Sequence, residues 1–192
     1  MDRLKEILAQ IDQQQRPPVH KWHPKHVGEI DIRIDTQGFW FHEGDAIARE
    51  QLVRLFASIL WFEKNEESDG DRGIGGSLVT GHYYLVTPVE KLAIAVEDVP
   101  FVVHQMEHVD DTWVAVTNTH EQLVIGEEHP VELRFYLGQQ VPYVRVRYDL
   151  WARVNRSIYY QWVTAAMHDQ SNENDLLLLR SAGYQFEVAR VN

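Results

Sequence analysis

Apolar and polar positions in this chain follow two periods, one typical of strands and one typical of helices. Apolar and charged residues alternate from Ile30 to Ile34, which predicts a half-buried strand. Residues 35–38 are of turn type, because Gly38 can adopt a positive φ, and residues 39–42 are expected to return as the partner strand. The segment therefore opens with a β-hairpin.

The period changes at residue 49 to that of an amphipathic helix. We expect this helix over residues 49–65, and its apolar face comprises Leu52, Leu55, Phe56, Ile59 and Leu60. Two more strands are predicted, over residues 83–86 and 92–96. Residues 66–81 are rich in Gly, Asp and Ser, without the lysine of a phosphate loop or the ligand spacing of a calcium loop, and indicate a mobile surface insertion.

Beyond residue 100 the pattern is mainly that of short strands separated by turn residues. The predicted strands cover residues 101–108, 112–116, 123–125, 131–137 and 143–148. A helix is expected over residues 155–168, and it is followed by a strand pair over residues 176–179 and 184–188.

The order hairpin, helix, hairpin occurs over residues 29–96 and again over residues 131–189. We therefore predict an α+β fold with a duplicated hairpin-helix-hairpin unit, in which extra strands of the second half close a small sandwich or barrel. The expected division is an N-terminal helix and lead-in over 1–21, a first repeat over 22–99 and a β-rich second repeat over 100–192. Pro17 and Pro18 end the first helix because proline lacks the backbone donor.

Composition narrows the function classes. The 192 residues carry a formal net charge of −11, so nucleic acid polymers and anionic membranes are not expected as partners. Cysteine is absent, which excludes disulfides and thiolate metal sites, and no apolar run is long enough to suggest a membrane span. The N-terminal residues lack the pattern of a secretory signal, and we expect a cytoplasmic protein.

Catalytic and metal-binding signatures are weak. No G-x-S-x-G, H-E-x-x-H or G-x-G-x-x-G motif occurs, so we expect neither an enzyme nor a cofactor. Three histidines surround Trp22 and Pro24, and they form either a metal site or a loop whose tryptophan fills the core.

One cluster of basic residues stands out in this acidic chain. Residues 132–156 contain five arginines, namely Arg134, Arg145, Arg147, Arg153 and Arg156. The planar guanidinium suits phosphate or carboxylate groups. Either these side chains pair with the surplus acids on a solvated strand face, with Arg145 and Arg147 pointing outward together, or they bind an anionic ligand.

Several short sequence motifs resemble those of a known protein family. They are W-H-P at residues 22–24, I-D-I-R-I at 30–34, T-P-V-E-K at 87–91, V-E-D-V-P-F at 96–101 and A-R-V-N-R-S at 152–157. Together they resemble the proteobacterial domain-of-unknown-function family 1285. The resemblance implies a duplicated core, a C-terminal half like a pleckstrin-homology fold, and a pocket between the halves for a nucleotide-like ligand in signal transduction.

Two functional hypotheses follow. The first is a bacterial ligand-binding and regulatory module whose aromatic residues stack a base and whose cations meet phosphate groups. Its candidate ligand-binding residues are Trp22, Trp40, Arg49, Lys91, Phe101, Arg153, Arg156 and Tyr160. The second is a protein-interaction or scaffold module without a small-molecule ligand, which would act as a homodimer or with another protein.

Overall fold

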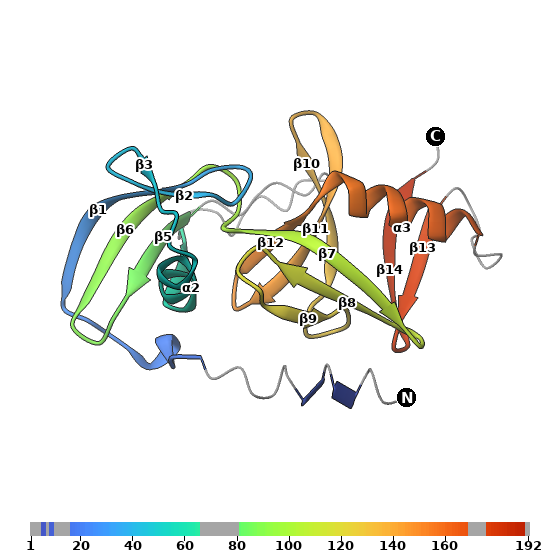
Figure 1. The fold of residues 1–192 in the computed structure, drawn as a ribbon, viewed down its shortest axis with the longest axis horizontal. Coiled ribbons are helices and arrows are strands. Elements are labelled where there is room, and N and C mark those ends of the chain that lie inside the picture. The colour runs from blue at the N-terminus through green and yellow to red at the C-terminus, as the bar shows by residue number, and fades with distance from the viewer. Residues whose placement is uncertain (1–4, 7, 10–15, 66–80, 169–175, 191–192) are drawn as a thin grey trace.

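The computed structural model describes residues 5–6, 8–9, 16–65, 81–168 and 176–190. Strands dominate, and they form two six-stranded sheets and a separate two-stranded sheet. Figure 1 shows the first sheet with helix α2 on the left and the second sheet with helix α3 on the right. The protein thus has two domains, each built on one large sheet.

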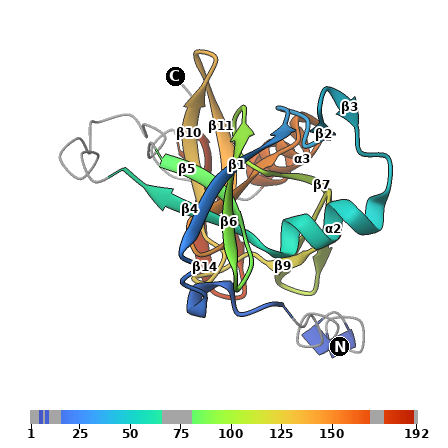
Figure 2. The same cartoon turned by 90° about the vertical axis from the view of Figure 1, so that its left-hand side faces the viewer.

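The N-terminal sheet consists of two three-stranded meanders. Its strands are β1 (His26–Ile34), β2 (Trp40–His42), β3 (Asp45–Ala46), β4 (Leu60–Lys64), β5 (Gly81–Val86) and β6 (Glu90–Val96). The strand order is β3-β2-β1-β6-β5-β4, and the central β1/β6 pair is parallel while the other pairs are antiparallel. Figure 2 shows β1 and β6 side by side in the middle of this sheet.

The C-terminal sheet has the same topology. Its strands are β7 (Phe101–Val109), β8 (Thr112–Thr117), β9 (Gln122–Val124), β10 (Val131–Tyr136), β11 (Gln139–Arg147) and β12 (Leu150–Val154). The order β10-β11-β12-β7-β8-β9 again joins two meanders through one parallel pair, β12 with β7. This sheet curves into a half-barrel, and the separate hairpin of β13 (Leu176–Ser181) and β14 (Tyr184–Arg190) packs beside it.

The duplication therefore lies in the sheets rather than in a hairpin-helix-hairpin order. The second copy runs from β7 to β12, and the predicted second repeat over residues 131–189 is wrong in its bounds. Helix α2 connects the two meanders of the first domain, whereas α3 follows the second meander of the other domain. The repeat prediction failed because it aligned the two helices, which occupy different places in the two copies.

Helix α2 (Glu50–Ser58) is shorter than its apolar pattern predicts. Leu60 pairs with Leu85 across the β4/β5 ladder, so the last apolar residues of the expected helix belong to a strand. Leu60 is fully buried and Leu55 is 56% exposed, which shows that the two were not on one helical face. Helix α3 (Arg156–His168) lies within the range predicted for it.

The lead-in, which in the structure comprises residues 16–25 before β1, crosses from one domain to the other. A short 3₁₀-helix η1 (Val19–Lys21) follows Pro17 and Pro18, and Val19 is buried. Arg16 forms an ion pair with Glu121 of the C-terminal domain, with an N–O distance of 2.9 Å. Most of the predicted N-terminal helix lies outside the described residues, as do residues 66–80 of the predicted insertion.

Polar contacts join the two domains along the length of their interface. The Arg147 guanidinium donates to the carbonyl of Ala57 at the end of α2, and Lys64 pairs with Asp149 at 3.2 Å. A third contact is made by the Asn118 amide, which donates to the Gly38 carbonyl at 2.9 Å. The interface is thus specified by directional contacts as well as by packing.

Gly38 is required at the turn that meets Asn118. Its φ is +80°, and a Cβ atom there would lie 2.5 Å from Asn118 Nδ2. We expect Gly38→Ala to lower the free energy of unfolding by at least about 1 kcal/mol, because both the backbone and the domain contact are strained. Gly44→Ala is the control, since Gly44 has a φ of +87° but no atom within 4 Å of its added Cβ. Equal losses for the two variants in urea unfolding would show that the Asn118 contact is unimportant.

Candidate functional site

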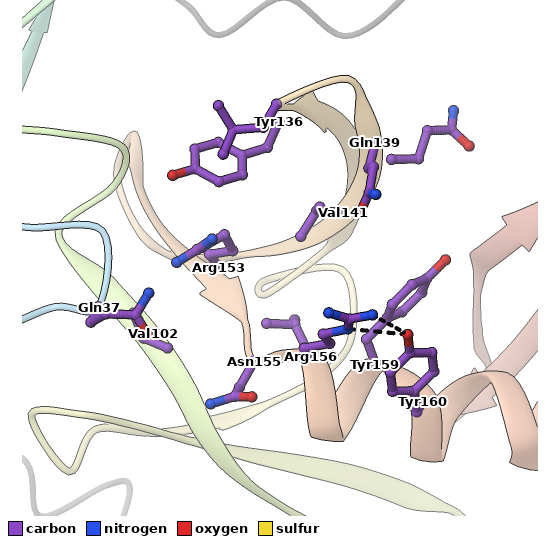
Figure 3. Close-up of a pocket in the computed structure, with 13 residues that line it drawn as sticks. Gln37, Val102, Tyr136, Gln139, Val141, Arg153, Asn155, Arg156, Tyr159 and Tyr160 are labelled. Atoms are coloured by element: carbon purple, nitrogen blue, oxygen red, sulfur yellow. Dashed lines mark hydrogen bonds between the residues drawn. The ribbon is translucent and has the colours of Figure 1, made fainter.

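A cavity of about 300 Å³ opens between the two domains, and we call it the domain pocket. Gln37 of the N-terminal domain forms one side, and strands β7, β10, β11 and β12 together with the first turns of α3 form the rest. Figure 3 shows Tyr136, Arg153, Arg156 and Tyr160 arranged around it.

The start of α3 is set by an asparagine. Asn155 Oδ1 accepts a hydrogen bond from the Ser157 backbone N–H at 3.1 Å, which is the side-chain capping expected at a helix N-terminus. The Asn155 N–H donates to the Val103 carbonyl at 3.1 Å, which attaches the cap to β7. The first helical turn is therefore held rigidly at the pocket wall.

Arg156 lies at the mouth of the pocket and folds back onto Tyr160. Its Nε and Nη2 donate to the Tyr160 hydroxyl at 3.1 and 2.8 Å, and its guanidinium carbon lies 5.4 Å from the ring centroid. Both residues are exposed, and Arg156 has no carboxylate partner among the described residues. A neutral phenol leaves the full cationic charge available to a ligand.

Arg153 lies deeper and joins the pocket to the domain interface. Its Nε lies 3.2 Å from Asp98 Oδ2, Nη2 donates to the Thr36 carbonyl of the other domain, and its guanidinium carbon lies 4.7 Å from the centroid of the Tyr136 ring. The Tyr143 hydroxyl donates to Asp98 Oδ1 at 3.0 Å. One guanidinium thus contacts both domains, the segment between them and the pocket.

Burial dominates the electrostatics of Asp98. Its side chain is 1% exposed, and loss of solvent raises its pKa above the ordinary value, while the Tyr143 hydrogen bond and the Arg153 charge oppose that rise. The pKa of Tyr143 is raised in turn by burial and by the charge of Asp98. Tyr143, Arg153 and the charge of Arg134 thus favour the ionised carboxylate, while burial opposes it.

The remaining walls of the pocket are aromatic or amide-bearing. Tyr136, Tyr159 and Tyr160 contribute rings, and the ring centroids of the last two lie 6.2 Å apart. Gln37 and Gln139 supply amide donors and acceptors. The pocket can accordingly hold an anionic group at Arg156 and a flat or polar group against the tyrosines.

The arginine cluster separates into different roles. Arg134 and Arg147 form ion pairs with Glu132 and Glu121, and Arg145 donates to two backbone carbonyls. Arg147 is only 9% exposed, so the prediction that it points outward is wrong. The alternation itself is kept, since Val144 and Val146 are fully buried, but the face that carries Arg147 is covered where its guanidinium donates to the Ala57 carbonyl of the other domain.

The eight predicted ligand-binding residues do not form one site. Arg153, Arg156 and Tyr160 line the domain pocket. Trp22 and Lys91 line a second cavity beneath the lead-in, which shares no residue with the first.

The other three predicted residues lie outside both cavities. Trp40 and Phe101 are core residues with 2% and 0% exposure, and the Trp40 ring stacks on Phe56 with centroids 6.1 Å apart. Arg49 is exposed at the N-cap of α2.

Several pocket residues escaped the sequence analysis. Tyr136, Gln139 and Val141 lie on the β10–β11 hairpin, where nothing in the sequence indicates which face meets the other domain. Asn155 could have been predicted as the N-cap of α3, because an asparagine just before a helical pattern is a typical N-cap. Asp98 does not line the pocket but pairs with Arg153, and it belongs to the V-E-D-V-P-F motif of the family resemblance.

Within the described ranges, histidine, aspartate and glutamate side chains nowhere gather into a group of three or more that could hold a metal ion. The same ranges contain no helix with the length and apolar character needed to cross a membrane.

Comparison with known proteins identifies the family. Residues 17–68 match the model of the N-terminal domain of a domain of unknown function, DUF1285, and residues 100–188 match its C-terminal domain. No curated protein matches the chain.

Two solved structures are similar to this one. A DUF1285 family protein from Silicibacter pomeroyi is 32% identical with a TM-score of 0.76, over 96% of this chain and 95% of that chain. A second, from Shewanella baltica, is 21% identical with a TM-score of 0.50, over 69% of this chain and 90% of that one, and shows likeness of fold alone. With both family domains matched and a close structural relative along almost its whole length, this chain belongs to the DUF1285 family.

Proposed function

We propose that this protein is a regulatory module that binds a small, anionic, nucleotide-like ligand in the domain pocket and acts in signal transduction. The observation that carries the proposal is the state of Arg156, an exposed cation at the pocket mouth with only a phenol as its partner among the described residues. In a chain with a net charge of −11, surplus carboxylates could have neutralised it. Guanidinium groups bind phosphate with two parallel hydrogen bonds.

Pocket size and lining support a ligand of mononucleotide size. A cavity of about 300 Å³ is at the small end of the range for ligand pockets. Arg156 would bind the phosphate, and Tyr136 and Tyr160 would contact the flat base by stacking. Arg153 would present its guanidinium behind Arg156 while it keeps its ion pair with Asp98, so most of the free positive charge would come from Arg156.

Ligand binding at Arg156 is testable by thermal shift with AMP, GMP, CMP and inorganic phosphate, after native mass spectrometry to detect a co-purified ligand. A nucleotide at ~100 times its dissociation constant should stabilise the fold by about 2.7 kcal/mol. We expect Arg156→Gln to weaken binding by about 1.5–3 kcal/mol, the value of hydrogen bonds to a charged group, which is roughly 10- to 150-fold in affinity.

Arg49→Gln is the matched control, because Arg49 is an exposed arginine that does not line the pocket. Equal binding by wild type and both variants would contradict the assignment of Arg156. Absence of any nucleotide-dependent shift would contradict the proposal itself.

The alternative function is a protein-interaction or scaffold module. Its support is apolar surface at the pocket rim, where Leu137 is 86% and Tyr160 is 53% exposed. Leu137 also has a φ of +49°, which is unfavourable for a bulky residue at a hairpin tip. Analytical ultracentrifugation tests self-association, and a monomer at every concentration would contradict a homodimer.

We propose that the C-terminal half is pleckstrin-homology-like, supported by its curved six-stranded sheet and the helix that follows it.

A further inference from the structure

The cavity beneath the lead-in has a volume of about 390 Å³ and is independent of the domain pocket; we call it the lead-in pocket. Two sequence motifs that the domain pocket does not use meet there. Trp22 and Pro24 of the W-H-P motif line it, and so does Lys91 of the T-P-V-E-K motif. The fold thus brings together two segments that are distant in the sequence.

The lead-in pocket is built on the outer face of the N-terminal sheet. Trp61 on β4, Val86 on β5 and Lys91 on β6 belong to this face, because Trp61 pairs with Tyr84 and Val86 pairs with Lys91 in the ladders. Val86 is only 2% exposed, so the lead-in covers this end of the sheet.

The C-terminal domain holds the walls of this cavity in place. The ring centroids of Tyr148 and Trp61 lie 5.0 Å apart, and the Tyr148 hydroxyl lies 2.8 Å from His20 Nδ1 in the lead-in. The pocket therefore has walls from the lead-in and the sheet, fixed from the other domain.

The lining carries two indoles, the imidazole rings of His20 and His23, and one ion pair. Trp22 and Trp61 provide two indoles, whose faces favour flat rings. Lys91 Nζ lies 2.7 Å from Glu63 Oε2 and 4.3 Å from the centroid of the Tyr84 ring. Because the ammonium and the carboxylate balance each other, they offer a strong donor and a strong acceptor without a net charge.

This chemistry selects a class of ligand. Because the Lys91–Glu63 pair carries no net charge, it offers neither a cationic nor an anionic ligand a net attraction. An aliphatic ligand would fill the space but gain little from the indole faces. We propose that the lead-in pocket binds an uncharged, planar heteroaromatic compound whose ring packs on Trp22 and Trp61 and whose polar edge bonds to Lys91 and Glu63.

Calorimetric titrations of the full chain with three amides of similar size test the aromatic ring and the polar ring edge of the ligand separately. Nicotinamide has an aromatic ring and a ring nitrogen, benzamide lacks the ring nitrogen, and cyclohexanecarboxamide lacks the aromatic ring. Adenosine serves as a larger, uncharged heteroaromatic probe. We expect nicotinamide and adenosine to bind with dissociation constants on the order of 1 mM, as small ligands of this size do, and cyclohexanecarboxamide not to bind.

Substitutions of the lining residues then test whether the ligand binds in the lead-in pocket. We expect Trp22→Ala to weaken adenosine binding by about 5- to 150-fold, the range for loss of one aromatic stacking partner. Lys91→Met should remove the preference for nicotinamide over benzamide, which gives a second readout that leaves both tryptophans in place. Circular dichroism checks that each variant is folded.

Arg156→Gln separates this site from the domain pocket and should leave adenosine binding unchanged. The proposal is overturned if neither nicotinamide nor adenosine binds saturably, if folded Trp22→Ala binds adenosine as wild type does, or if Arg156→Gln abolishes that binding. Failure of nucleotide binding at Arg156 would not affect it, because the two sites share no residue.

Discussion

Replacing Arg153 with methionine is expected to lower the free energy of unfolding by about 3–5 kcal/mol, the cost of removing one partner of a buried ion pair. Asp98 would keep the Tyr143 hydrogen bond but lose its ion-pair partner inside the protein, and the Thr36 carbonyl would lose its donor from the other domain. Chemical denaturation of the two proteins at pH 7 measures the effect. A loss below about 1 kcal/mol, the value of an exposed pair, would show that this contact is not structural.

The pH dependence of this loss identifies its cause. Without Arg153 the pKa of Asp98 should rise further above its ordinary value, because burial already raises it and the opposing charge is gone. A carboxyl whose folded pKa is raised contributes stability below its unfolded pKa, and this contribution is lost as the pH rises through the folded pKa. The deficit of Arg153→Met should therefore be smaller at pH 5 than at pH 8.

A double variant tests whether Asp98 and Arg153 stabilise the protein through their mutual contact. Asp98→Asn in the Arg153→Met background removes the unpaired carboxylate, so the two substitutions together should cost less than the sum of their separate effects. Strict additivity would mean that Asp98 and Arg153 do not stabilise each other.

Trp162→Ala should cost about 3–5 kcal/mol through the cavity it creates in the C-terminal core. Trp162 is fully buried, and its ring centroid lies 5.2 Å from that of Phe186 and 6.4 Å from that of Trp113. The residue anchors α3, whose first turns carry Arg156 and Tyr160, so the same substitution should also weaken nucleotide binding.

Trp162→Phe is the matched control for this cavity. It keeps an aromatic ring and removes an indole N–H that finds no acceptor among the described residues. We expect it to cost clearly less than Trp162→Ala in thermal unfolding. Similar losses for both would mean that the shape of the indole, rather than buried volume, determines the stability of this core.

Strand positions in this protein were predictable because its period-2 patterns are local. The alternation from Ile30 to Ile34 lies within β1, and Gly38 takes the positive φ expected of it. The end of α2 was not predictable, since Leu60 fits a helical face as well as a strand and only pairing with Leu85 decides between them. Pairing between strands joins residues that are distant in the sequence, and a local period carries no information about it.

The same limit explains which site residues could be found. Arg153, Arg156 and Tyr160 are near one another in the sequence, around the start of one helix, so a local pattern placed them together. Trp22 and Trp40 are both tryptophans that the sequence suggests for a ligand site. In the structure, Trp22 lines the lead-in pocket and Trp40 is buried in the core. Burial of a tryptophan depends on the partner element, and the sequence offers no local sign of it.

Arginine side-chain NMR is the sharpest measurement of whether an anionic ligand binds at Arg156. In a 22.4 kDa protein the Nε–Hε signals of individual arginines can be followed while AMP is added. We predict saturable shifts of the Arg156 signal, and of Arg153 behind it, with the Arg49 signal unchanged. Saturable AMP binding that leaves the Arg156 signal in place, or no binding at millimolar AMP, would show that Arg156 does not bind the ligand.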